Sequence, residues 1–360
     1  MATEIPLLSK KCRWINNPTR LLRNWSEGNF WLIIWQGFNK TITDAYEWLS
    51  DKYNPGDEIF IFGFSRGAYA ARSLAGYIAK YGLLKRGAPL GVKQLYERYR
   101  RNARTIWEIL GSPEGATDAE EQWIVKYSQS IYIKFVGVWD TVGTLGIPFF
   151  HIPGISRSTL GFLDTGLSRP IENGFHALAI DEHRRDFTPT LWTVESMDSN
   201  TAIKDAPPKR PLTSVEQRWF VGSHDNIGGG RKNDPLAKVP LRWIMKKALL
   251  HGLAFQDDVD VDADVLKARI YDSYSDFWYG IYARCNSPYF RPIGEPPKGQ
   301  TDGAHTNVNE TIDVSVFDRW RSDPEYRPNN LVDWRKRRNV DIATLKTSVR
   351  ADEPKEDVPD

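Results

Sequence analysis

The sequence predicts an α/β fold in which a mostly parallel sheet carries helices on both faces. Residues 41–53 have a helical pattern, residues 59–62 form a continuous apolar run, and residues 67–81 are helical again. A continuous apolar run is typical of a parallel strand that is covered on both faces. Helix, strand and helix in direct succession therefore favour a layered α/β domain.

The flanks of these elements support the assignment. Thr41 and Asp44 have a spacing similar to that of a capping box at the start of the first helix. The Asn-Pro-Gly-Asp sequence of residues 54–57 is a turn by composition, and Gly82 is a typical helix terminator. Residues 92–110 are then predicted to form a second, charged helical stretch.

Apolar runs recur three times further along the chain. The runs lie at residues 131–139, within 188–194 and at 219–221, and each leads into a polar loop. We expect strands at these runs and a helix whose interior begins near Leu236. From about residue 256 the pattern weakens, because aromatic residues, arginine and proline become frequent.

Composition and charge narrow the class of protein. The 360 residues are 41% hydrophobic, which is enough for a sizeable core, and 48 basic against 46 acidic residues leave a net charge of +2. This balance gives no argument for nucleic-acid binding. Two cysteines cannot form a disulfide framework, which fits a reducing compartment. Because no apolar run approaches about 18 residues and no signal peptide is recognised, we expect a cytoplasmic protein.

The longest apolar run near the start, residues 30–38, reads FWLIIWQGF. We interpret it as a peripheral strand or helix. Because basic residues precede it, the alternative is a segment that makes transient contact with a membrane surface. The basic residues are Lys10, Lys11, Arg13, Arg20 and Arg23.

One short stretch carries the strongest chemical signal. Residues 59–76 read IFIFGFSRGAYAARSLAG, with Ser65 between Gly63 and Gly67 where the predicted strand becomes a helix. Such a turn exposes the serine hydroxyl at the carboxyl end of the strand, beside a helix N-terminus, and the glycines allow close packing. The functional interpretation is a nucleophilic serine. The alternative is a turn whose small residues serve only the close packing of strand and helix.

A nucleophilic serine needs a base and an acid, and chain position selects candidates for both. Among the six histidines, His224 is the best candidate for the base. It stands just past the apolar run 219–221, from which Gly222 and Ser223 separate it. Ligands of open α/β sheets bind at the carboxyl ends of strands. Asp140 ends the run 131–139 in the same way. The chain order Ser65, Asp140, His224 is the order that α/β-hydrolases use for nucleophile, orienting acid and general base.

Other assignments stay open. Asp181 and Asp225 are rival acids, Asp140 could be only a turn cap, and His224 could be a loop histidine that bonds to the glycines after it. Together with His176, these side chains could instead ligate a cation. No pair has the spacing of a His-x-x-x-His site, so we expect neither a metal nor another cofactor.

Six motifs occur in an order that resembles a known family. They are PGDEIFIFGFSRGAYAARSLAG, FVGVWDTVGTLGIP, HALAIDEHRRDFTPTLW, WFVGSHDNIGGG, LAKVPLRWIMKKA and SVFDRWRSDPEYRPNNL. Over about residues 38–332 the chain resembles the uncharacterised α/β-hydrolase family related to the catalytic domain of type VI secretion phospholipase effectors. By this resemblance Ser65 is the nucleophile, His224 is the histidine of a His-x-x-x-Gly-Gly-Gly loop, and Asp140 belongs to a Trp-Asp-Thr-Val-Gly strand end.

The resemblance implies a serine hydrolase with an α/β-hydrolase-like fold. Its substrates would be small-molecule or lipid carboxylic esters, phospholipids among them. The chain then divides into four parts. They are an atypical N-terminal segment (1–37), an α/β-hydrolase-like catalytic domain (38–255), a helical or irregular C-terminal extension packed on the same domain (256–345) and a disordered tail (346–360).

The chain departs from the family pattern at its start. Family members usually open with a strand that ends in a Phe-Asp-Gly-Thr loop, which residues 1–37 lack. That loop would supply one N–H of the oxyanion hole, and Arg66 would supply the other. We expect residues 31–35 to fill part of the gap without supplying a donor. Since one lost donor costs about 10²–10³ in rate, the alternative function is a catalytically impaired binding or interaction protein.

Overall fold

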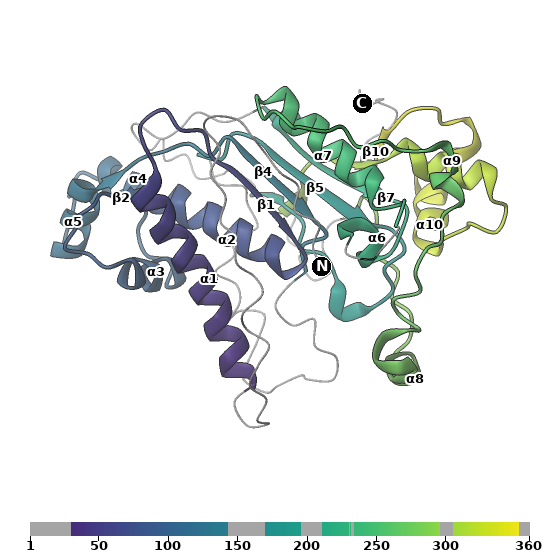
Figure 1. Ribbon diagram of the computed structural model, residues 1–360, viewed down its shortest axis with the longest axis horizontal. Coiled ribbons are helices and arrows are strands. Elements are labelled where there is room, and N and C mark those ends of the chain that lie inside the picture. The colour runs from purple at the N-terminus through teal and green to yellow at the C-terminus, as the bar shows by residue number, and fades with distance from the viewer. Residues whose placement is uncertain are drawn as a thin grey trace.

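A six-stranded sheet forms the centre of the molecule (Figure 1). The computed structural model describes residues 30–142, 170–195, 211–229, 231, 234–295 and 305–352. The strand order is β1-β4-β5-β7-β9-β10, and all neighbours pair in parallel except the last, which is antiparallel. The predicted α/β fold with a mostly parallel sheet is therefore confirmed.

The elements of the described residues are as follows. The sheet contains β1 (Phe60–Phe64), β4 (Phe135–Trp139), β5 (Gly174–Ala179), β7 (Val215–Phe220), β9 (Glu310–Ile312) and β10 (Val349–Arg350). Two small ladders pair β2 (Leu83–Leu84) with β3 (Ser128–Gln129), and β6 (Thr193–Glu195) with β8 (His305–Asn307). The α-helices are α1 (Phe30–Lys52), α2 (Arg66–Tyr81), α3 (Val92–Arg100), α4 (Ile106–Gly111), α5 (Ala119–Tyr127), α6 (His224–Gly228), α7 (Lys238–Leu250), α8 (Ile281–Cys285), α9 (Val314–Ser322) and α10 (Asn329–Arg338).

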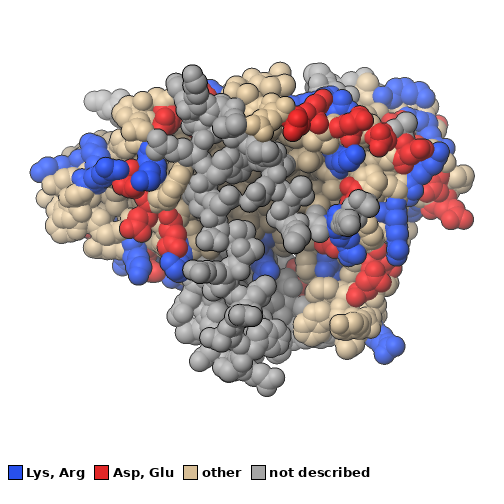
Figure 2. Space-filling view, viewed as in Figure 1, with Lys and Arg blue, Asp and Glu red and all other residues tan. Residues whose placement is uncertain are grey.

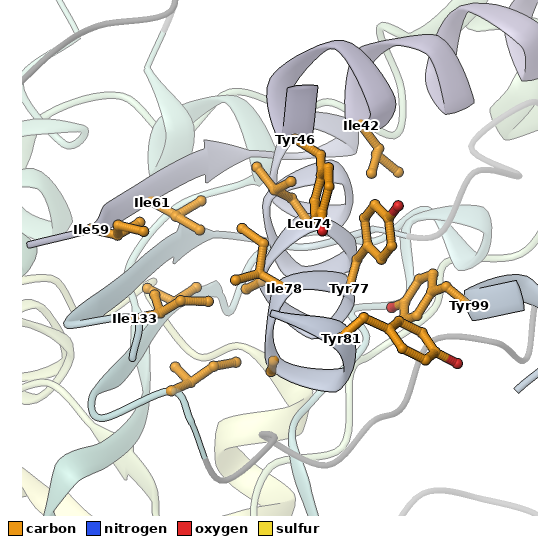
Figure 3. Packing of buried hydrophobic residues seen from close by; sticks show 14 of the residues in the cluster. Ile42, Tyr46, Ile59, Ile61, Leu74, Tyr77, Ile78, Tyr81, Tyr99 and Ile133 are labelled. Atoms are coloured by element: carbon orange, nitrogen blue, oxygen red, sulfur yellow. The ribbon is translucent and has the colours of Figure 1, made fainter. Parts of the chain in front are cut away.

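Alternate residues of the strands face two different helical layers, as the period of a strand requires. Ile59 and Ile61 pack with α1 and α2, where the rings of Tyr46 and Tyr77 stack 4.2 Å apart (Figure 3). Phe62, which points the other way, joins the cluster that includes Trp243 of α7. Both faces of β1 are thus covered, which explains its continuous apolar sequence.

The C-terminal part of the chain completes the sheet. The residues predicted to form an extension, 256–345, supply β9 and the α9 and α10 cluster around Trp334. The prediction of a disordered tail from residue 346 is wrong for its first part. Val349 pairs with Ile312 in β10, and the Ala351 amide donates to the Glu310 carbonyl at 2.8 Å. Residues 353–360 lie outside the described residues.

Other boundaries shifted for local reasons. The helix predicted at 41–53 is the second half of the longer α1, and the stretch 92–110 is two helices rather than one. The break occurs because Thr105 caps a new helix, with a capping box that it shares with Glu108. The strand predicted at 131–139 begins regular pairing at Phe135.

The N-terminal region is described only in part. Residues 30–38 form the first turns of α1, so the backbone of residues 31–35 is helical, and the packing of their side chains lies outside the described residues. Within the described chain, β1 pairs with β4 alone and is an edge strand of the sheet. No helix of the described residues is long and apolar enough to cross a membrane.

The two glycines that flank Ser65 have different roles, which predicts different effects of substitution. A Cβ at Gly63 would lie 2.4 Å from the Gly67 carbonyl oxygen, whereas a Cβ at Gly67 would meet nothing within 4 Å. We expect Gly63→Ala to lower the free energy of unfolding by about 1–3 kcal/mol, because helix α2 must move away from β1. Gly67→Ala should change it by less than about 0.5 kcal/mol.

Urea unfolding followed by circular dichroism measures both free energies. Equal destabilisation by the two substitutions would contradict the close approach of strand and helix at Gly63.

Candidate active site

Ser65 lies in the sharp turn between β1 and α2. Its backbone has φ 58° and ψ −122°, a conformation that a non-glycine residue adopts only when its surroundings impose it. The Ser65 amide donates to the Trp139 carbonyl at 3.0 Å, which continues the β1–β4 pairing up to the turn. Ser65 directly follows the carboxyl end of β1 and is only partly buried.

His224 is the first residue of α6, directly after β7. The turn before it requires Gly222, whose φ is +123°, and Ser223 and Asn226 form a capping box that starts the helix. The imidazole Nε2 lies 2.8 Å from the Ser65 hydroxyl oxygen. The ring packs against Phe64, with ring centroids 4.7 Å apart. The imidazole is therefore fixed in orientation and largely shielded from water.

Asp140 follows β4 and lies on the other side of the imidazole. Its Oδ2 is 2.6 Å from Nδ1 of His224, and its Oδ1 accepts from the Ala179 amide at 3.1 Å. The residue has φ +39°, and its own amide continues the sheet by donating to the Ala177 carbonyl. Ser65, His224 and Asp140 thus form one hydrogen-bonded series at the carboxyl ends of three parallel strands.

Arg291, which sequence reasoning missed, binds the same carboxylate. Its two terminal nitrogens lie 2.6 Å from Oδ1 and 3.0 Å from Oδ2 of Asp140, and both side chains are 0% exposed. Burial alone would raise the pKa of Asp140, but the Arg291 charge and the bond to His224 hold it well below its usual range. Arg291 lies in a region of weak pattern, so no spacing in the sequence could have identified it.

Glu182 is a second residue that the sequence did not single out. Its buried carboxylate accepts the backbone N–H of His224 at 3.2 Å and the hydroxyl of Ser273 at 2.7 Å, and it pairs with Arg184. Burial opposes ionisation, but the Arg184 bonds and charge lower the pKa of Glu182 below its usual value. Glu182 therefore anchors the backbone that carries the histidine.

The other candidates from the sequence have structural contacts instead. His176 is buried in β5, where Nε2 accepts the Thr141 amide at 3.0 Å, and burial lowers its pKa to about 3. Asp181 accepts the Gly222 amide at 2.7 Å and thereby orders the turn before His224, and burial raises the pKa of Asp181. Asp225 points outward.

Asp225 forms an exposed ion pair with Arg231 at 2.8 Å. In the part of the chain that the structure describes, no three His, Cys, Asp or Glu side chains are grouped so that they could hold a metal ion.

Fold and site together define an α/β protein of the α/β-hydrolase-like class. A serine on a strand-to-helix turn, an acid after a later strand and a histidine after a further one occur in the chain order of that class. Residues 15–247 match the family model described as T6SS, phospholipase effector Tle1-like, catalytic domain, and the chain belongs to this family. Arg291 lies beyond the matched residues.

Several relatives cover only part of this chain, and the chain covers only part of them. The uncharacterized protein YEL023C of Saccharomyces cerevisiae is 33% identical over 209 residues, which are 51% of this chain and 28% of the yeast protein. The crystal structure of an uncharacterized protein from Pseudomonas aeruginosa aligns with 62% of this chain and 28% of its own. The TM-score is 0.33 and the sequence identity is 16%. The structure of the Tle1 effector bound to the VgrG spike aligns with 57% of this chain and 32% of the effector chain. The TM-score is 0.23 and the sequence identity is 21%.

Removal of the Asp140 charge should destabilise the protein strongly. Asp140→Asn leaves the buried Arg291 without its counter-ion, so we expect a loss of about 3–5 kcal/mol in the free energy of unfolding at pH 7. Since the pKa of Asp140 is lower in the folded than in the unfolded chain, its stabilisation is complete above its ordinary pKa of 3.8 and decreases as the pH falls below that value. The difference between the two proteins should therefore shrink in acid.

Asp225→Asn is the matched control, because it removes an adjacent but exposed ion pair and should cost at most about 1 kcal/mol. Urea titrations between pH 3 and pH 7 measure both differences. A cost for Asp140→Asn as small as the control's would contradict the buried pairing.

Proposed function

We propose that the protein is a serine hydrolase that cleaves carboxylic esters, with Ser65 as nucleophile, His224 as general base and Asp140 as orienting acid. The single observation that carries the proposal is the unbroken series from the Ser65 hydroxyl to the Asp140 carboxylate, with links of 2.8 and 2.6 Å through one imidazole. A base within hydrogen-bond reach of a hydroxyl can accept its proton during attack.

The chemistry follows from these positions. Ser65 Oγ attacks the ester carbonyl while Nε2 of His224 takes its proton, and Asp140 stabilises the resulting imidazolium through the Nδ1 hydrogen. The carbonyl oxygen becomes an oxyanion, which the Arg66 N–H at the start of α2 would stabilise. His224 then returns the proton to the departing alcohol, and water hydrolyses the acyl-enzyme by the same steps in reverse order.

Lipid esters are the substrates that we propose. Membership of a phospholipase effector-like family supports this choice. A second support is a path of aromatic rings that leads away from the histidine. Phe187 packs edge-on against His224 with centroids 5.1 Å apart, and Phe277 packs against Phe187 at 5.8 Å. The two rings offer apolar contacts to an acyl chain, and the Arg184 guanidinium lies over both of them, 3.5 and 4.7 Å from their centroids.

The path ends on an exposed aromatic tip, which we define as Trp278, Tyr279 and Ile281 of η5 (Phe277–Gly280) and α8. Trp278 is 49% exposed, Ile281 is 48% exposed and Tyr279 is fully exposed. Trp278 and Tyr279 also have left-handed backbone conformations, which are rare for bulky residues. Figure 2 shows an uncharged area over α8 with charged side chains at its margins. Tryptophan and tyrosine favour the membrane–water interface, so this tip would contact the lipid surface transiently.

A non-catalytic binding or interaction protein is the second candidate. The observation that favours it is the edge position of β1 in the described sheet, since no described strand precedes it with an oxyanion loop. In that case the hydrogen-bonded series would remain, but the rate of ester cleavage would be low for want of a second donor. Direct reaction of Ser65 with an active-site probe distinguishes the two candidates.

A fluorophosphonate probe should label the native protein at Ser65, because its hydroxyl is bonded to a base. Ser65→Ala should abolish labelling and lower the turnover of a short-chain nitrophenyl ester by about 10⁴–10⁶-fold. Ser73→Ala, which removes a buried hydroxyl from the same helix, is the matched control and should leave both unchanged. A folded native protein that neither reacts with the probe nor cleaves esters would favour the binding protein.

The aromatic tip should matter only at a lipid surface. Replacing Trp278 and Tyr279 by alanine should weaken binding to phospholipid vesicles by about tenfold or more, because that apolar area no longer leaves water. Turnover of a soluble short-chain ester should not change. Leu250→Ala, at the end of α7, removes a side chain that is 77% exposed elsewhere and serves as control. A vesicle cosedimentation assay that gives equal binding for all three proteins would exclude the tip as a contact.

A further inference from the structure

The Asp140 carboxylate is bound from two opposite directions. His224 donates to Oδ2 from one side, and the Arg291 guanidinium spans both oxygens from the other. Arg291 also donates to the carbonyls of Ala179 and Phe187, which are the last residues of β5 and of η2 (Arg185–Phe187). The guanidinium is therefore held by four acceptor atoms in a fully buried place, and its position is fixed independently of the histidine.

A buried cation at this place has a definite effect on proton binding. An ionised aspartate beside a histidine favours the imidazolium, because the two charges attract. A guanidinium in bidentate contact offsets much of that attraction and repels the imidazolium itself. It also resists protonation of the carboxylate. Either way, the Asp140–His224 pair takes up a proton only at lower pH than it would without Arg291.

We propose that Arg291 is a positioning residue that holds the Asp140 carboxylate toward His224 and, through its charge, opposes protonation of the pair. The proposal rests on the proposed function in one respect only: the unprotonated pair is the form that can accept the Ser65 proton. The expected consequence is an enzyme whose activity extends further into acid than that of a triad whose aspartate has no cationic partner.

Other charged groups around the pair do not replace this effect. From the loop after β5, Glu182 faces the His224 backbone but is neutralised by Arg184 at 2.8 Å. From α6, Asp225 is turned outward to Arg231.

The remaining neighbours of the pair are largely neutral. From β5, His176 is uncharged near neutral pH because burial lowers its pKa to about 3. From the turn after β1, Ser65 contributes a neutral hydroxyl, and Phe64 and Phe187 contribute rings. Within the described residues, Arg291 is the cation in direct contact with the carboxylate.

The test compares a charge-conserving with a charge-removing substitution. Arg291→Lys keeps the positive charge but loses the two-point contact, and Arg291→Gln keeps donors but loses the charge. The measurement is the pH dependence of kcat/KM for a soluble ester. We expect the acid limb of Arg291→Gln to move up by about one pH unit or more, which is the order of pKa shift that a directly neighbouring charge produces. Arg291→Lys should lower kcat while its acid limb moves by less than half as much.

A matched control is Arg218→Met, which breaks another buried pair, with Glu216 and Asp313, outside the site. It should lower stability without moving the acid limb. Loss of kcat in both Arg291 variants with an unmoved acid limb would mean a merely structural role and would overturn the proposal, as would equal shifts in the two variants. If Arg291→Gln does not fold, Arg291→Met is the second neutral variant.

A readout without activity separates this inference from the proposed function. Histidine ¹⁵N signals are followed by NMR between pH 4 and pH 9 in Ser65→Ala protein, with His224 assigned by its loss in His224→Gln. The His224 titration midpoint should move up when Arg291→Gln is added to Ser65→Ala. If this shift is seen but the native protein cleaves no ester, the inference stands and the proposed function is refuted. No shift would overturn the inference even in an active enzyme.

Discussion

The site depends on one buried carboxylate. Asp140 is 0% exposed, and a carboxylate in that place would be strongly disfavoured without compensation. The structure compensates it with donors from three directions, namely the Ala179 amide, the His224 ring and the Arg291 guanidinium. Because these donors come from different segments, the carboxylate links the ends of β4, β5 and β7 to the C-terminal part of the chain.

This linkage explains why the C-terminal extension cannot be separated from the site. The family match ends at residue 247, yet Arg291 and Ser273 both contact groups that position the histidine. The same region supplies β9, which pairs with β7, and β7 leads directly into His224. A division of the chain at residue 255, although it follows the sequence pattern, would therefore leave the carboxylate and the sheet incomplete.

Unusual backbone conformations occur at the ends of two strands of the sheet. Ser65 and Asp140 both have positive φ, and each is held there by an amide hydrogen bond that continues the parallel pairing to the next strand. Two glycines allow close packing around these turns. Gly63 has no room for a side chain beside α2, and Gly228 has none beside the ring of Phe64. Regular pairing of the strands thus holds Ser65 and Asp140 in unusual backbone conformations.

The sequence by itself determined the strand, turn and helix around Ser65 and the strand ends that carry Asp140 and His224. Those features depend on local patterns of apolar and small residues, which a single chain displays directly. It did not reveal the central strand β5, because GFHALA contains no β-branched residue and is recognisable only by its pairing with β4 and β7. Nor could it choose between Asp140 and Asp181, since both follow or adjoin apolar runs.

Only the tertiary structure decided which acid meets the histidine and which cation meets the acid. Arg291 is 151 positions from Asp140 in the chain, and Glu182 is 42 positions from His224. Contacts of that range follow from the order of strands in the sheet and the path of the chain over its edge, not from local spacing. A buried charge must find partners wherever the fold brings them, and the identity of those partners is a property of the fold rather than of any one motif.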